Sequence, residues 1–113
     1  MTAATAERND VTLVGRLAAP AEERGLPSGD AIATFRVVVG RPPRPGSRAP
    51  AVDALDCVAW SAAARRTVLG WTKDDVVEVT GALRRRFWRG AGGAVSRTEV
   101  EVLKARRVAK APP

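Results

Sequence analysis

Apolar and polar residues alternate over most of this chain, and this two-residue period restricts the fold more than any other feature. Such alternation predicts strands with one buried and one exposed face, because successive side chains of a strand point to opposite sides. Five segments show it: 11–18 (continuing toward Arg24), 31–40, 52–60, 73–90 and 94–108. Turn residues fill the segments LPSGD (26–30) and GAGG (90–93), so we expect one hairpin around each.

One segment has a helical period instead. Ser61 is a candidate N-cap, the three alanines after it favour helix, and Gly70 can end the helix. The prolines and arginines of residues 41–51 predict a long, mobile basic loop, because proline removes a backbone donor that a central strand needs.

The order of elements therefore predicts an all-β fold with one short helix between the third and fourth strands. This order suits a five-stranded Greek-key barrel, the OB-fold, whose open face and loops bind oligonucleotides. We expect a single domain at residues 8–108, with disordered tails at 1–7 and 109–113.

The charge is concentrated in one third of the chain. The net charge is +7; residues 1–80 carry ten basic and ten acidic residues, whereas residues 81–113 carry nine basic and two acidic ones. A polyanion is the expected partner of such a segment.

Candidate catalytic residues are scarce. The chain has no histidine and one cysteine, which excludes imidazole proton transfer and thiolate zinc sites. The adjacent Asp74 and Asp75 are interpreted as polar residues that open a strand, and Cys57 as a small buried hydrophobe. We expect no enzyme, cofactor or metal. The sequence shows neither a membrane span nor a signal peptide, so a cytoplasmic protein is expected.

The segment GALRRRFWRGAGG (81–93) places two aromatic residues among four arginines. In a strand, one face takes Arg84, Arg86 and Trp88, and the other takes Arg85, Phe87 and Arg89. The face predicted to be buried upstream, which includes Leu83, continues into Arg85 and Phe87.

Either the strand leaves the barrel after Leu83, or a bulge near Gly81 changes the register. In both cases Trp88 stands beside two arginines on an exposed face. That arrangement suits single-stranded nucleic acid, with an aromatic platform for bases and guanidinium groups for phosphates. The alternative is that Trp88 covers the barrel and the arginines serve only solubility.

Six segments carry a resemblance to a known family: NDVTLVGRL, LPSG, TFRVVV, DCVAWSAAA, VVEVTGALRRRFW and TEVEV. Over residues 8–108 the chain resembles the bacterial single-stranded DNA-binding proteins. The resemblance implies an OB-fold that assembles, usually as a homotetramer, and binds single-stranded DNA without sequence preference during replication, recombination or repair. It places base-stacking aromatics at Trp60 and Trp88, and basic contacts at Arg24, Arg84 and Arg86. Phe35 and Trp71 are expected to pack in the core.

The chain also departs from that family. Leu55 stands where the family often has an aromatic residue, the 41–51 loop has none, and Lys73-Asp74-Asp75 replaces Lys-Gly-Asp. The chain ends in VAKAPP without the acidic tip that recruits partner enzymes, so we expect that recruitment to be absent. Three alternatives stay open: an OB-fold protein-interaction module such as an accessory primosome subunit, an RNA-binding OB domain, and a dimer in place of the tetramer.

Overall fold

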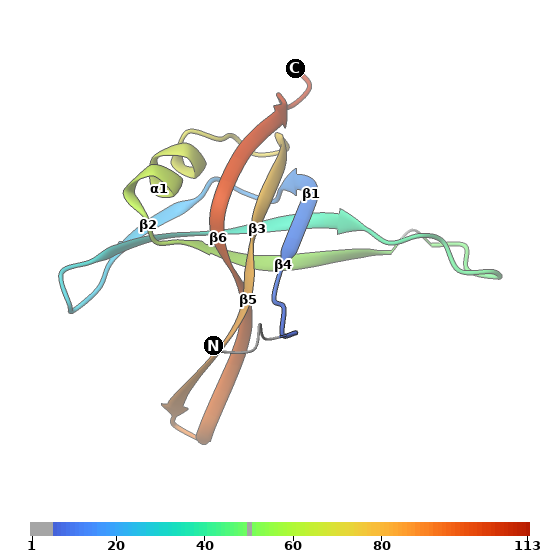
Figure 1. Ribbon diagram of the computed structural model, residues 1–113. Helices are drawn as coiled ribbons and strands as arrows, with labels where there is room; N and C mark the ends of the chain where they lie inside the picture. Colours follow the sequence, from blue (N-terminus) through green and yellow to red (C-terminus); the bar gives the residue numbers. More distant parts are fainter. Residues whose placement is uncertain (1–5, 50) are drawn as a thin grey trace.

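The fold was analysed in a computed structural model, which describes residues 6–49 and 51–113 (Figure 1). The predicted order of strands and helix is confirmed, with the first strand divided in two. The elements are β1 (Val11–Leu17), β2 (Glu22–Gly25), β3 (Ala31–Gly40), β4 (Val52–Ala59), α1 (Ala62–Leu69), β5 (Val76–Gly90) and β6 (Gly93–Ala109). The predicted N-terminal tail lies mostly outside the described residues, as does Pro50 of the 41–51 loop. The described part of that loop contains neither strand nor helix.

The strands close into a barrel. They follow the order β1-β5-β6-β4-β3-β2, and a further pairing of β1 with β3 closes the barrel. β1 pairs with the second half of β3, and the short β2 pairs with the beginning of β3. The β4–β6 pair is parallel and the other pairs are antiparallel. Closure removes the unpaired edges that an open sheet would present. This architecture is the five-stranded OB-fold, with α1 between β4 and β5.

The barrel encloses an apolar core. The rings of Trp71 and Phe35 pack perpendicular to each other at a centroid distance of 5.7 Å, so the expected packing role of both residues is confirmed. Cys57 is buried beside them, and burial is the main reason that the pKa of its thiol rises to about 12. The thiol is therefore uncharged at neutral pH and unreactive. The other core residues are Leu17, Ala33, Val37, Ala59, Ala64, Val68, Val77, Val79, Val100 and Val102.

The helix α1 begins where the sequence predicts. The Ser61 side chain accepts a hydrogen bond from the amide of Ala64 at 3.1 Å, and Gly70 ends the helix. Ala64 and Val68, one turn apart, are the residues that α1 buries. In the described part of the chain, no helix has the length and apolar character needed to cross a membrane.

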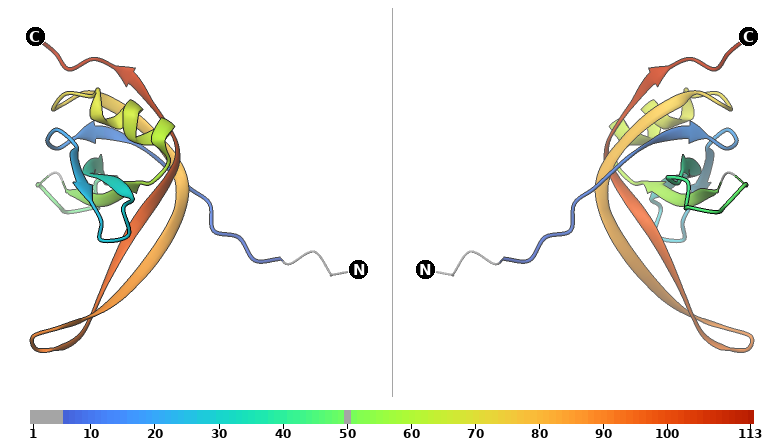
Figure 2. Two further views of the ribbon diagram at one scale, coloured as in Figure 1. Left: turned by 90° about the vertical axis from the view of Figure 1, so that its left-hand side faces the viewer. Right: turned by 90° about the vertical axis from the view of Figure 1, so that its right-hand side faces the viewer.

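The hairpin of β5 and β6 extends beyond the barrel (Figures 1 and 2). β1 accompanies β5 only as far as Gly81, and Leu83 is already 47% exposed. The predicted departure of this strand from the barrel is confirmed. A register shift also occurs at Thr80/Gly81, because Gly81 faces Val102 whereas Thr80 faces Lys104. Leu103 of β6 has no partner on β5, so the extra residue belongs to β6. Successive side chains of β5 therefore keep pointing to alternate sides of the hairpin.

The C-terminal segment is tied to the start of β5. Ala109 still pairs with Val76, and the amide of Ala111 donates to Asp75 Oδ1 at 2.7 Å. The sequence predicted disorder from residue 109 onward, and the first part of that segment instead has an ordered contact. The reason is the buried Asp75 carboxylate, which needs donors from several directions.

Candidate nucleic-acid interface

A shallow depression on the outer face of the sheet gathers four of the five residues that the sequence singles out. Arg24 reaches it from β2, Trp60 from the end of β4, and Arg86 and Trp88 from β5. Its volume is about 290 Å³, and Leu26, Ile32, Thr34, Arg97 and Glu99 complete its lining. These side chains meet because alternate residues of neighbouring strands point to the same side of the sheet.

Arg86 lies between an aromatic ring and a carboxylate. Its guanidinium carbon is 5.1 Å from the centroid of the Trp60 ring, and its Nε is 3.1 Å from Glu99 Oε1. The cation therefore covers a face of Trp60 while the carboxylate neutralises its charge. The indole Nε1 of Trp60 is buried and has no hydrogen-bond partner in the described part of the chain.

Trp88 is the open aromatic of this depression. It is 47% exposed, although a large aromatic ring normally buries most of its area. Directly opposite on β6 stands Val95, a smaller side chain. The flat ring of a ligand can stack on the exposed indole of Trp88 at little cost in conformational entropy.

Arg84 is the one predicted residue outside the depression. It shares the face of Arg86 and Trp88, but its Nε donates to Glu101 Oε1 at 3.2 Å. Its side chain remains half exposed, on the same face of the hairpin as Trp88.

Sequence reasoning missed Arg97 and Glu99. Both lie on β6 and line the depression, and Arg97 stands directly opposite Arg86 across the hairpin. Two like charges in opposite positions destabilise a strand pair unless an anion lies near them. The register could have been found by counting outward from the GAGG turn, where Gly90 pairs with Gly93.

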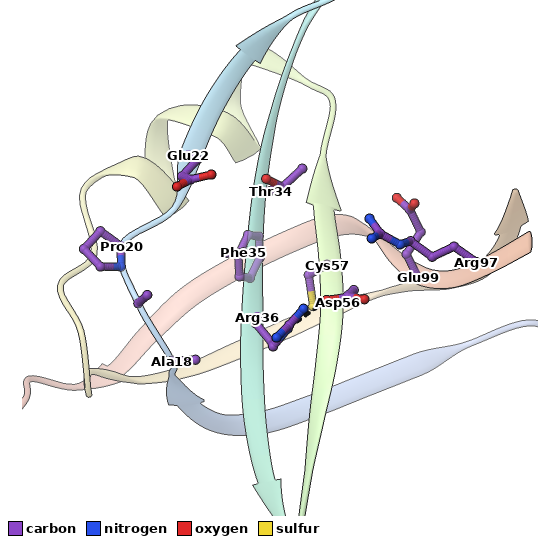
Figure 3. Close-up of a pocket in the computed structure, with 11 residues that line it drawn as sticks. Ala18, Pro20, Glu22, Thr34, Phe35, Arg36, Asp56, Cys57, Arg97 and Glu99 are labelled. Carbon is purple, nitrogen blue, oxygen red and sulfur yellow. Dashed lines mark hydrogen bonds and ion pairs between the residues drawn. The ribbon is translucent and has the colours of Figure 1, made fainter. Parts of the chain in front are cut away.

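A second depression adjoins the first (Figure 3). It shares Thr34, Arg97 and Glu99 with the first and has a volume of about 300 Å³. In it Arg36 and Asp56 form an ion pair at 2.9 Å. The other lining residues are Ala18, Ala19, Pro20, Glu22, Phe35 and Cys57. The two depressions therefore adjoin at Thr34, Arg97 and Glu99, which lie on β3 and β6.

An OB-fold with an exposed tryptophan among arginines on its outer face is typical of the class that binds single-stranded nucleic acid. The sequence model of the Single-strand binding protein family matches residues 8–108, and the chain belongs to this family. This agrees with the resemblance found in the sequence.

Individual relatives agree with this assignment. "Single-stranded DNA-binding protein 3" of Listeria innocua is 35% identical over 85 residues, which cover 75% of this chain and 53% of the relative. "Single-stranded DNA-binding protein 1" of Streptococcus agalactiae is 34% identical over 75% of this chain and 52% of its own. The chain thus spans about half the length of the curated relatives it matches.

A solved structure shares the fold. It is described as "Plasmodium falciparum SSB complex with ssDNA" and superimposes with a TM-score of 0.75 at 20% identity. The match covers 92% of this chain and 96% of the other.

Proposed function

We propose that this chain binds single-stranded DNA without sequence preference and protects it during replication, recombination or repair. The observation that carries the proposal is the convergence of Trp60, Trp88, Arg24 and Arg86 in one depression. The role is binding and not catalysis, and we place it in the cytoplasm.

Bases stack on the open ring of Trp88, while phosphates contact the arginines around it. Arg24 and Arg97 have no ion-pair partner among the described residues, so they meet a phosphate without giving up another contact. Arg86 exchanges Glu99 for phosphate, which also uncovers the Trp60 ring. Every base has a stacking face, so this mode of binding tolerates any sequence.

Assembly belongs to the same proposal. One barrel of this size contacts few nucleotides, on the order of 4–16, and several barrels wrap a longer strand. We propose a homotetramer, with a dimer as the second possibility. Light scattering at micromolar protein distinguishes these states, and a monomer would contradict the proposal.

Titration of the intrinsic tryptophan fluorescence tests the function. Oligo(dT) should quench it strongly, because Trp88 is exposed and stacks on bases. Duplex DNA should quench little, since its bases are stacked on one another. Comparable affinity for poly(U) would favour an RNA-binding domain, because stacking and phosphate contacts do not inspect the sugar. Failure of all three polymers would favour a protein-interaction module.

A further inference from the structure

The β5–β6 hairpin has a second aromatic residue, and it lies on the face opposite Trp88. Phe87 is 69% exposed, the largest exposed fraction of any large apolar side chain in the described part of the chain. Arg85 and Arg89 flank it on β5, and the residues opposite them on β6 are Thr98, Ser96 and Ala94. The hairpin has left the barrel here, and no other strand in the described part of the chain covers this face (Figure 2). We call Arg85, Phe87 and Arg89 the reverse face.

The reverse face has uncompensated positive charge. Residues 81–98 contain five arginines and no aspartate or glutamate. On the Trp88 side, Arg84 and Arg86 pair with glutamates that lie further along β6. On the reverse face, Arg85 donates only to the Ser96 hydroxyl at 3.5 Å, and Arg89 has no ion-pair partner among the described residues. An anion is therefore attracted to the reverse face without competition from a carboxylate.

The Phe87 ring already has a cation over it. The guanidinium carbon of Arg85 is 5.2 Å from its centroid. An exposed ring beside such a guanidinium combines a platform for a base with a donor for the adjoining phosphate. A second copy of this chain would need an acidic patch opposite Arg85 and Arg89, whereas nucleic acid presents a phosphate at every nucleotide.

We propose that the reverse face is a second stacking site for single-stranded nucleic acid, and this proposal rests on the function proposed above. β1 leaves β5 at Gly81, and the Asn9 side chain continues along this edge of β5 with two hydrogen bonds to the backbone of Leu83. Among the described residues, no strand pairs with this edge at Trp88. A strand bound on Trp88 passes around this edge and places a later base on Phe87. The hairpin then contacts one strand on both of its faces.

Phe87→Ala tests the site with oligonucleotides of two lengths. An oligo(dT) of about 8 nucleotides fits the Trp60–Trp88 depression alone, whereas one of about 30 reaches both faces. The variant should bind the long oligonucleotide about tenfold more weakly than the parent, as expected for one lost base stack. Its affinity for the short one should be unchanged. Leu103→Ala is the matched control, since Leu103 is 63% exposed on β6 away from the hairpin tip.

Equal affinity of parent and Phe87→Ala for the long oligonucleotide would overturn the proposal. An equal loss of affinity for the short and the long oligonucleotide would also overturn it. So would a change in the mass of the Phe87→Ala protein in light scattering without a change in its affinity, because that result would indicate that Phe87 contacts another copy of the chain. If the parent itself fails to bind, the proposed function fails, and the two failures are thereby distinguished.

A fluorescence measurement gives a direct readout of stacking. Phe87→Trp is made in a Trp60→Phe/Trp88→Phe background, where the only other indole is the buried Trp71. The long oligonucleotide should quench the new fluorescence and the short one should not. Absence of quenching by the long oligonucleotide, at concentrations where it is bound, would contradict the site.

Discussion

Glu99 lies in the middle of the proposed DNA-binding face, although its charge repels phosphate. It is only 9% exposed and holds Arg86 against the ring of Trp60. Arg86 and Arg97 lie directly opposite each other on β5 and β6, and their like charges repel. The carboxylate of Glu99 reduces this repulsion in the free protein. The residue therefore stabilises the hairpin, and in the proposed function it competes with phosphate for Arg86.

Glu99→Gln should tighten the binding of oligo(dT). The substitution keeps the shape of the side chain and removes an ion pair worth up to about 1 kcal/mol, which corresponds to about fivefold in affinity. If the released Arg86 neutralises one more phosphate, the log–log slope against salt should steepen by about 0.7. Glu78→Gln is the control, because it removes the same charge from the ion pair with Arg106, away from the depression. Weaker binding by Glu99→Gln would show that the carboxylate positions Arg86 for the ligand.

Asp75 joins the two ends of the long hairpin. Its carboxylate accepts from the amide of Thr72 at 2.8 Å and from that of Ala111 at 2.7 Å, and Arg107 lies 3.6 Å away. These hydrogen bonds, the one from Thr72 first, lower the pKa of Asp75 below its ordinary value of 3.8. The neighbouring Asp74 has φ of 72°, a conformation that favours glycine, which accounts for the glycine that the family has there.

The pH dependence of unfolding tests the Asp75 assignment. A carboxyl whose pKa is lower in the folded than in the unfolded state stabilises the fold at pH values above its unfolded-state pKa. This stabilisation is lost as the pH falls through the folded-state pKa. Asp75→Asn should therefore be less stable than the parent at neutral pH, and the difference should shrink below about pH 4. Urea unfolding over a pH series measures it, with the exposed Asp10→Asn as control. A difference that is constant with pH would contradict the role of the charge.

At the scale of elements, the sequence predicted each strand and the helix because alternation and caps are local properties. The register between β5 and β6 was not predicted in the same detail. From the turn to Gly81 the register follows from the pairing of Gly90 with Gly93, which places Arg97 opposite Arg86. Alternation along one strand does not reveal such pairing between strands, so Arg97 and Glu99 were not predicted. Closer to the start of β5 the register also depends on Leu103, an unpaired residue of β6 that shifts the pairing.

Gly81 is the position where this hairpin leaves least room. A Cβ there would lie 1.8 Å from the carbonyl oxygen of Glu101, a backbone atom that cannot move alone. Gly81→Ala should lower the free energy of unfolding by on the order of 3 kcal/mol. Gly92→Ala, which meets nothing within 4 Å, is the matched control. Equal urea midpoints for the two variants would contradict the close approach of β6.

At the scale of the whole molecule, the charge and the depression are parts of one surface. The sequence predicted an excess of positive charge beyond residue 80, and the barrel carries part of it to the depression through Arg86 and Arg97. Trp60 and Arg24 reach the same place from strands that are distant in sequence. That convergence could be expected only from the family resemblance, because no local pattern connects these segments.

The most direct test of this account is the affinity for oligo(dT) of Trp60→Ala and Trp88→Ala, measured beside the parent. Each variant should fold and should lose about 1–3 kcal/mol of binding free energy, the contribution of one base stacked on an aromatic ring. Trp71→Phe is the control, since Trp71 is a core residue that is 5% exposed. It should bind as the parent does. A folded Trp88→Ala protein with the parent's affinity would contradict the account, because the open ring in the depression would then have no part in binding.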